Sequence, residues 1–184
     1  QKAMGQMVLY IKTFSMSRED SYELLNEYVK NEALVKHYKM VATAMEGYVK
    51  KLKLSDSEIE EWWSAGLLHD LDWEKYPDEH PNYAVTSILP QKGYSNQILD
   101  AIKAHATSRT GKVAETSIEK YLFACDELSG FINAVGLIRP NGINDMEASS
   151  VSKRLKDKRF AANVSREDIA QGIEMIGIPL SEHI

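Results

Sequence analysis

The chain has 184 residues and a formal net charge of −5, from 22 Lys and Arg against 27 Asp and Glu. This length fits one domain with a full hydrophobic core, and the 43% share of apolar residues excludes a largely disordered or fibrous chain. The single cysteine, Cys125, excludes an internal disulfide framework and zinc ribbons or fingers. The acidic balance disfavours nucleic acid, and no apolar run is long enough to span a membrane. We therefore expect a cytoplasmic protein.

Helical periodicity dominates the sequence in chain order. Ser17 followed by Asp20, and Ser55 followed by Glu58, are typical of helix N-termini. The expected helices cover 17–30, 32–52, 55–68, 81–90, 95–105, 117–138, 149–160 and 165–177. Within 81–90, Pro81 suits a first helical turn and Pro90 is expected to end the helix. Only 8–14 is a candidate strand, so the sequence predicts an all-α fold.

The domain organisation follows from the breaks in this periodicity. The segment Arg139-Pro140-Asn141-Gly142 interrupts the helical pattern. We expect a single-domain helical bundle at 17–140, with a short C-terminal helical appendage at 141–184 packed on the same domain. Because Met16 looks like a natural start, residues 1–16 are expected to form an N-terminal extension that is disordered or not native.

Histidines and aspartates recur at predicted apolar helix faces and helix ends. A buried carboxylate without a partner is very costly, so Asp126, which lies mid-helix among apolar neighbours, must be exposed, paired or bound to a cation. For any one histidine, an ordinary core or surface imidazole is the alternative. Imidazole and carboxylate together suit Mn, Fe, Co, Ni or Zn, and without an H-E-x-x-H pair the ligands must converge from separate helices. The candidate ligands are His37, His69, Asp70, His80, His105 and Asp126.

The ordered set His37, His69-Asp70 and Asp126 resembles the H…HD…D pattern of the HD-domain metal-dependent phosphohydrolases. The resemblance covers 17 to about 139, and His80 and His105 match the further histidines of the HDIG-type branch. The tail around 153–161 is similar to that of a subgroup of small bacterial HD proteins. The resemblance implies an HD-type helical bundle that binds one or two divalent metal ions.

The resemblance also implies a role for each ligand. One metal would be held by His37, His69, Asp70 and Asp126, and Asp70 would bridge to a second metal held by His80 and His105. Asp70 and His69 would be the catalytic residues. The implied reaction is attack of a metal-bound hydroxide on the phosphorus of a phosphate ester, with a nucleotide or another small phosphorylated metabolite as substrate.

The sequence departs from the HDIG pattern directly after Asp70. The pattern has Ile-Gly-Lys there, whereas this chain has Leu71-Asp72-Trp73, and Lys75 comes two positions late. A non-catalytic metal- and ligand-binding sensor module is therefore the alternative to an enzyme. A third reading, a structural metal in a helical adaptor, predicts a closed coordination sphere. A homo-oligomer is compatible with the sequence.

Several cations are candidates for binding substrate phosphate: Lys75, Arg109, Arg139, Lys153 and Arg154. The alternative is that they are surface cations, and that the basic run from Lys153 to Arg159 is a solvated helix face. Cys125 is expected to be a small buried hydrophobe, and Trp62 and Trp63 to be core and rim residues. His183 is expected to be solvated.

Overall fold

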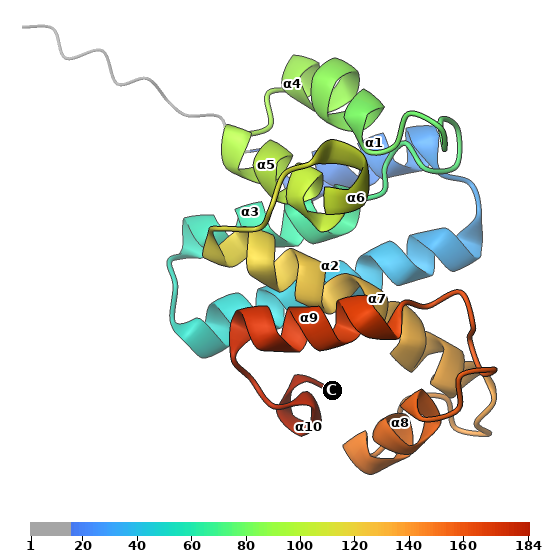
Figure 1. The fold of residues 1–184 in the computed structure, drawn as a ribbon. Helices are drawn as coiled ribbons and strands as arrows, with labels where there is room; N and C mark the ends of the chain where they lie inside the picture. The colour runs from blue at the N-terminus through green and yellow to red at the C-terminus, as the bar shows by residue number, and fades with distance from the viewer. Residues whose placement is uncertain (1–15) are drawn as a thin grey trace, which may run out of the picture.

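The computed structural model describes residues 16–184, and the candidate strand at 8–14 lies outside them. Within the described residues the fold is an all-α, single-domain bundle of ten α-helices and one π-helical turn, without strands (Figure 1). The elements are α1 Arg18–Tyr28, α2 Glu32–Leu52, α3 Asp56–Leu68, η1 Ala84–Ile88, α4 Leu89–Lys92, α5 Asn96–His105, α6 Thr107–Thr110, α7 Ser117–Leu137, α8 Ala148–Leu155, α9 Arg166–Ile176 and α10 Leu180–His183. None of these helices is both long and apolar enough to cross a bilayer.

Side-chain caps set the starts of the principal helices. The Ser17 hydroxyl accepts a bond from the Asp20 N–H, and the Asp20 carboxylate accepts one from the Ser17 N–H, which confirms the predicted cap of α1. The Glu58 carboxylate likewise accepts a bond from the Ser55 N–H at the start of α3. These bonds satisfy donors that have no partner inside the helix.

Two predicted helix ends are wrong. Pro90 does not end a helix: it lies in the first turn of α4, directly after η1. The Leu89 N–H donates to the Ala84 carbonyl and closes η1. Pro90 follows in the first turn of α4, where a residue needs no N–H for an intrahelical hydrogen bond. The basic helix ends at Leu155 instead of 160. The Arg166 guanidinium donates to backbone carbonyls of the turn that follows, including those of Ala161 and Val164, and so satisfies acceptors outside any helix.

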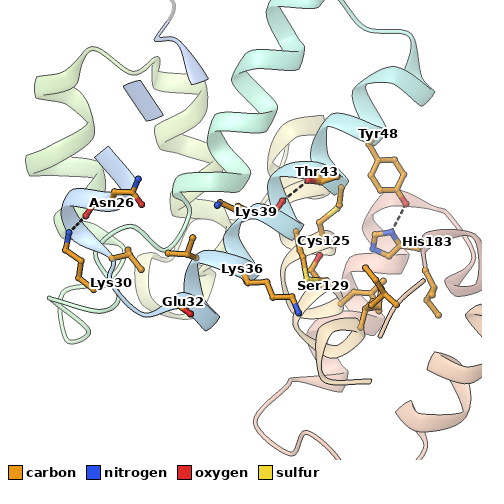
Figure 2. Close-up of a pocket in the computed structure, with 18 residues that line it drawn as sticks. Asn26, Lys30, Glu32, Lys36, Lys39, Thr43, Tyr48, Cys125, Ser129 and His183 are labelled. Atoms are coloured by element: carbon orange, nitrogen blue, oxygen red, sulfur yellow. Dashed lines mark hydrogen bonds between the residues drawn. The ribbon is translucent and has the colours of Figure 1, made fainter. Parts of the chain in front are cut away.

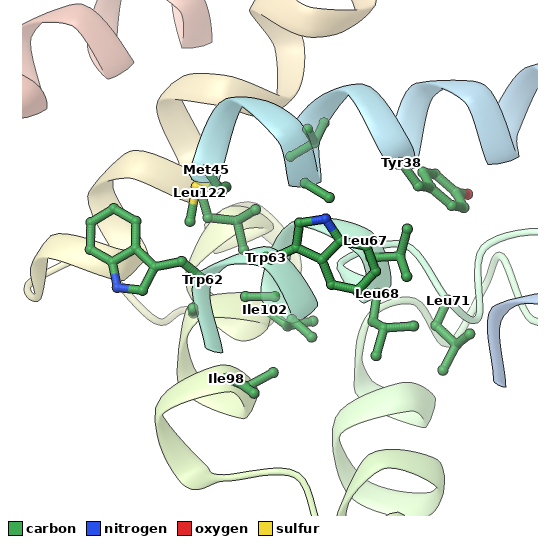
Figure 3. Close-up of a cluster of buried hydrophobic side chains, with 14 of the residues drawn as sticks. Tyr38, Met45, Trp62, Trp63, Leu67, Leu68, Leu71, Ile98, Ile102 and Leu122 are labelled. Atoms are coloured by element: carbon green, nitrogen blue, oxygen red, sulfur yellow. The ribbon is translucent and has the colours of Figure 1, made fainter. Parts of the chain in front are cut away.

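The main core lies between α2, α3, α5 and α7. Trp62 and Trp63 are both buried, and Figure 3 shows them among side chains from the other three helices. Gly66 permits the close crossing of α2 and α3, since a Cβ there would lie 2.7 Å from the Ala42 Cα. This crossing brings the C-terminal end of α3, where His69 lies, against α2.

A second core cluster joins the C-terminal helices to the same domain. Phe131 and Val135 of α7 pack with Val151 of α8 and Ile169 of α9. The long helix α7 therefore contributes its first half to the main core and its second half to this cluster. Its middle turn, around Asp126, lies between the two.

Candidate metal centre

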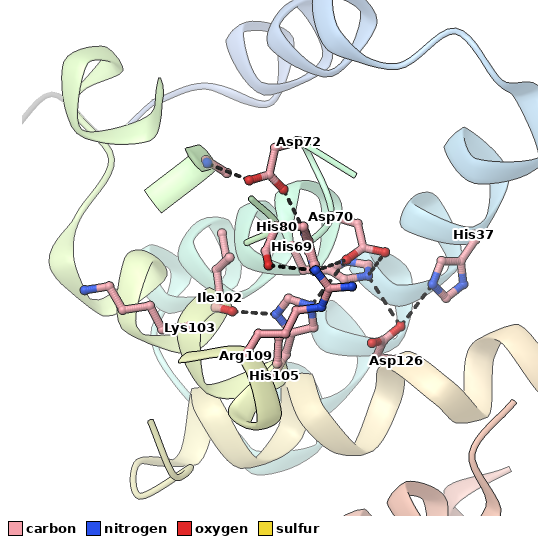
Figure 4. Close-up of polar contacts among 12 residues, drawn as sticks. His37, His69, Asp70, Asp72, His80, Ile102, Lys103, His105, Arg109 and Asp126 are labelled. Carbon is pink, nitrogen blue, oxygen red and sulfur yellow. Dashed lines mark hydrogen bonds and ion pairs between the residues drawn. The ribbon is translucent and has the colours of Figure 1, made fainter. Parts of the chain in front are cut away.

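Six side chains from five parts of the chain converge in one place. His37 comes from α2, His69 and Asp70 follow α3, and Asp126 lies in the middle of α7. His80 lies in the turn before η1, and His105 is the last residue of α5. Figure 4 shows the four histidines directed at the two aspartates. The structure thus brings together all six candidate metal ligands.

The six residues form two groups of three. In the first group, the Asp126 Oδ1 lies 3.0 Å from the His37 Nε2 and 3.4 Å from the His69 Nε2. In the second, the Asp70 Oδ1 lies 3.2 Å from the His80 Nε2 and 3.3 Å from the His105 Nε2. Within each group one ligand atom per residue lies within 4.8 Å of the others. We call them the His37 group and the His80 group.

Asp70 connects the two groups through its second oxygen. Its Oδ1 faces His80 and His105, whereas its Oδ2 lies 3.6 Å from the His69 Nε2 of the other group. A carboxylate with one oxygen toward each group has the arrangement of a bridging ligand.

Hydrogen bonds orient three of the four imidazoles. The Nδ1 of His69 donates to the Gly66 carbonyl at 2.8 Å, and that of His105 donates to the Ile102 carbonyl. The Nδ1 of His80 donates to the Asp72 carboxylate at 2.7 Å. Each bond fixes the proton on Nδ1 in the neutral imidazole and presents the Nε2 lone pair to an aspartate, as second-sphere partners do for metal-ligating histidines.

The arrangement favours a cation between these atoms. The His69 Nε2 is buried and has no hydrogen-bond partner in the described part of the chain, although two carboxylates lie close to it. A lone pair facing a carboxylate oxygen is repulsive unless a proton or a metal ion lies between them. Nitrogen and oxygen donors in this combination fit a first-row divalent ion, so the residues present fit one or two such ions.

The pKa values of His69 and Asp126 also indicate that this centre stabilises positive charge. Burial alone would lower the pKa of His69, but the carboxylates of Asp70 and Asp126 outweigh it and raise the pKa to about 9. Burial would raise the pKa of Asp126, yet His69 and His37 hold it well below its usual value. Without a metal, the cluster therefore retains a proton.

Solvent reaches the centre from the side of the carboxylates. The side chains of Asp70 and Asp126 are 19% and 21% exposed and that of His37 is 18% exposed, whereas that of His69 is fully buried. His80 and His105 are almost fully buried. The candidate ligands are thus buried on the side of His69, His80 and His105 and partly exposed at His37, Asp70 and Asp126, unlike the closed sphere of a structural metal site.

The predicted phosphate-binding cations are not all at this centre. Arg109 is close: its guanidinium donates to the His80 carbonyl at 3.3 Å and to the Pro77 carbonyl at 2.8 Å, and lies over the exposed Trp73 ring. Lys75 instead donates to the Glu27 carbonyl at 2.8 Å. The other three line a different cavity, of about 520 Å³, which contains none of the six ligands: Arg139, Lys153 and Arg154.

Three residues of the centre were not predicted. Asp72 is fully buried, and besides binding His80 it accepts the Ala84 N–H at 2.7 Å. Gly66 supplies the carbonyl for His69, and Gly130 lies beside His37, where a Cβ would make an ordinary contact of 3.7 Å with the His37 Cε1. Asp72 lies eight positions before its partner His80 in the sequence, and no local sequence pattern indicates such a pair.

The expectation that His183 is solvated is wrong. Its Nδ1 accepts a bond from the Tyr48 hydroxyl at 2.6 Å, and its Nε2 donates to the Ala124 carbonyl at 2.9 Å. Cys125 is buried, as predicted, and burial raises the pKa of its thiol. Neither residue belongs to the six-residue cluster.

Comparison of the chain with family models, with curated proteins and with solved structures gives no match. The roles of the six residues therefore rest on their geometry and on the chemistry of their donor atoms.

Proposed function

We propose that this protein is a metal-dependent hydrolase of phosphate esters. The observation that carries the proposal is the pair of His/Asp groups joined by Asp70, with one carboxylate oxygen toward each group. Two such groups side by side suit chemistry in which charge on a phosphoryl group must be neutralised from more than one direction.

Divalent ions held by these side chains would supply Lewis acidity, neutralise phosphoryl oxygens and lower the pKa of a water molecule. The protein's own contribution is positional. His69 and His105 are held by backbone carbonyls and His80 by Asp72, so their Nε2 atoms face the centre before any ion binds. Asp70 is the residue that relates the two groups to each other.

The proposed substrate is a nucleotide or another small phosphorylated metabolite. Arg109 places a cation at the edge of the His80 group, where it can approach a phosphate through donors that are not bound to the backbone. Trp73, 37% exposed beneath that guanidinium, adds an aromatic surface. The chain is acidic overall, which disfavours a large polyanion and favours a small substrate.

The test measures inorganic phosphate release from a panel of phosphomonoesters and nucleotides with added Mn²⁺, Co²⁺, Ni²⁺ or Zn²⁺. We expect activity that chelation removes and that falls at least about 100-fold in Asp70→Asn. Asp100→Asn is the matched control, because within residues 16–184 Asp100 forms an ion pair only with Lys103, at the surface. Absence of release from the whole panel, or full activity in Asp70→Asn, would contradict the proposal.

A second candidate function is a sensor module that binds metal and ligand without turnover. The specific observation in its favour is the lack of a lysine after Asp70: Leu71-Asp72-Trp73 stands there, and Lys75 points to the Glu27 carbonyl. This function predicts saturable, metal-dependent binding of a phosphorylated ligand that is recovered unchanged.

A further inference from the structure

A cavity lies along α2 and α7, and its lining is separate from the candidate metal ligands. It has a volume of about 1110 Å³, and none of the six candidate ligands lines it. We call it the α2–α7 groove. Pockets for small molecules typically measure about 300–1,000 Å³ and are mostly apolar, so the groove is large enough to hold an organic ligand.

The floor of the groove is apolar. Val29 and Leu128 are buried there, and Met40, Ala44 and Ile132 are partly buried. Water on such a floor gains little from the protein, so an apolar ligand that displaces it is stabilised by the hydrophobic effect. The floor therefore favours an aliphatic group.

Cations line the rim on the N-terminal half of α2 and just before it. Lys30, Lys36 and Lys39 are exposed, and in the described part of the chain none forms an ion pair. Among the groove-lining residues that the structure describes, Glu32 has the only acidic side chain. On a protein of net charge −5, this rim is a local concentration of positive charge.

The side chains that close the other end of the groove are uncharged. Tyr48 and His183 close it, and their hydrogen bonds, one into Nδ1 and one from Nε2, are those of a neutral imidazole. Figure 2 shows Lys30 toward one end, the Tyr48–His183 pair at the other, and Lys36 between them. From Lys36 to Tyr48 the helix rises about 18 Å at 1.5 Å per residue, which is comparable to an extended dodecyl chain.

We propose that the α2–α7 groove binds an amphipathic anion, with its aliphatic tail on the apolar floor and its carboxylate or phosphate head at Lys36. The lysines exclude a cationic amphiphile by repulsion, and the uncharged side chains of Tyr48 and His183 suit a tail that carries charge only at its head. This inference does not depend on the proposed hydrolase activity, because the metal centre contributes no residue to the groove.

Calorimetric titration of the full chain tests the proposal, with dodecanoate, dodecyl phosphate and dodecyltrimethylammonium as probes below their micelle concentrations. We expect saturable binding of one anion per chain and at least tenfold weaker binding of the ammonium compound. Binding of dodecanoate alone would assign a carboxylate head, and tighter binding of dodecyl phosphate would assign a phosphate head.

Two variants test whether the ligand binds in the groove. Thr43→Trp fills it from an exposed position on α2 and should weaken binding at least tenfold, while circular dichroism verifies the fold. Lys36→Glu should weaken binding of the anions severalfold, whereas Lys92→Glu, an equal change of charge on α4, should not. No saturable binding, equal binding of both charge types, or undiminished binding to a folded Thr43→Trp would overturn the proposal.

Discussion

The His37 group and the His80 group contain the same three donors, two imidazoles and one carboxylate, but they are held in place differently. The His37 group draws its residues from the long helices α2 and α7 and from the end of α3. In the His80 group, Asp70 and His80 lie on the irregular segment after α3, and His105 ends α5.

Hydrogen bonds compensate for this difference in the backbone. Both imidazoles of the His80 group have a partner at Nδ1, whereas the Nδ1 of His37 is buried without one among the described residues. His37 lies on the regular helix α2, and its Nε2 is 3.0 Å from the Asp126 Oδ1. On the irregular segment, Asp72 orients the His80 imidazole. The two groups should therefore respond differently to the same kind of substitution.

The largest effect is expected when the His80 group is removed. The double variant His80→Ala/His105→Ala should bind one divalent ion per chain where the unaltered protein binds two, since the His37 group keeps its three donors. Metal analysis after dialysis measures the ratio, and His37→Ala is the reciprocal variant. Saturation of the unaltered protein at one ion, or an unchanged ratio in the double variant, would contradict two separate sites.

A smaller effect is expected from Asp72→Asn. The amide can still accept the Ala84 N–H, but its other end donates, so it would bind the His80 Nδ1 only in the tautomer that protonates Nε2. We expect affinity for the ion in the His80 group to fall about 10–100-fold, with the ion in the His37 group unaffected. Competition titration with a chromogenic chelator measures the two metal affinities separately. An equal loss of affinity in the His80 group and the His37 group would show that Asp72 supports the whole fold and not the His80 imidazole alone.

A pH titration should distinguish the His37 group through His69. Its folded pKa of about 9 exceeds the ordinary 6.5, so in metal-free protein the proton stabilises the fold fully below pH 6.5, and that stabilisation is lost as the pH rises through 9. Because metal and proton compete for Nε2, affinity should rise about tenfold per pH unit from pH 6.5 to 9. An affinity independent of pH over this range would show that His69 is not a ligand.

The smallest effect is expected at Glu127, next to Asp126. Burial, followed by the charge of Asp126, raises the pKa of Glu127 to about 7 from an ordinary 4.5. Folding therefore favours the protonated acid, and stability falls as the pH rises from 4.5 through 7. Glu127→Gln, which can still accept the Ser165 N–H, should be more stable at pH 8 by about 1 kcal/mol, a value reduced by water screening.

Bound metal sharpens this prediction. An ion in the His37 group offsets the charge of Asp126, so the advantage of the Gln variant in chemical denaturation should shrink when metal is added. The same advantage with and without metal would mean that Asp126 does not bind the ion.

Helix positions could be predicted from the sequence because their signals are local. Ser17, Ser55, Ser95 and Ser165 each cap the helix that follows, and every cap uses residues within three positions. Pro90 misled for the same reason: proline signals both helix ends and helix starts, and only the Leu89–Ala84 bond of η1 decides between them.

The six candidate ligands could also be selected from the sequence, because histidines and aspartates at apolar helix faces in this order suggest a metal. Their division into two groups was implied by the family resemblance, whereas the residue types and spacing alone do not give it, since it depends on how α2, α3, α5 and α7 cross. The partners of His80 and His183 are likewise set by tertiary contacts, with Asp72 eight residues away and Tyr48 on another helix. Tertiary contacts also bring Arg139 and Lys153 together, at a cavity that shares no residue with the metal centre.

Cys125 has a practical consequence as the single thiol of the chain. It is buried on α7 between the groove, which it helps to line, and Asp126, its neighbour in sequence. A buried thiol with a raised pKa reacts only when the surrounding structure opens. The rate at which a disulfide reagent modifies Cys125 therefore reports how often the structure around this part of α7 opens. Ligands on either side of α7 can be compared by how far each lowers this rate.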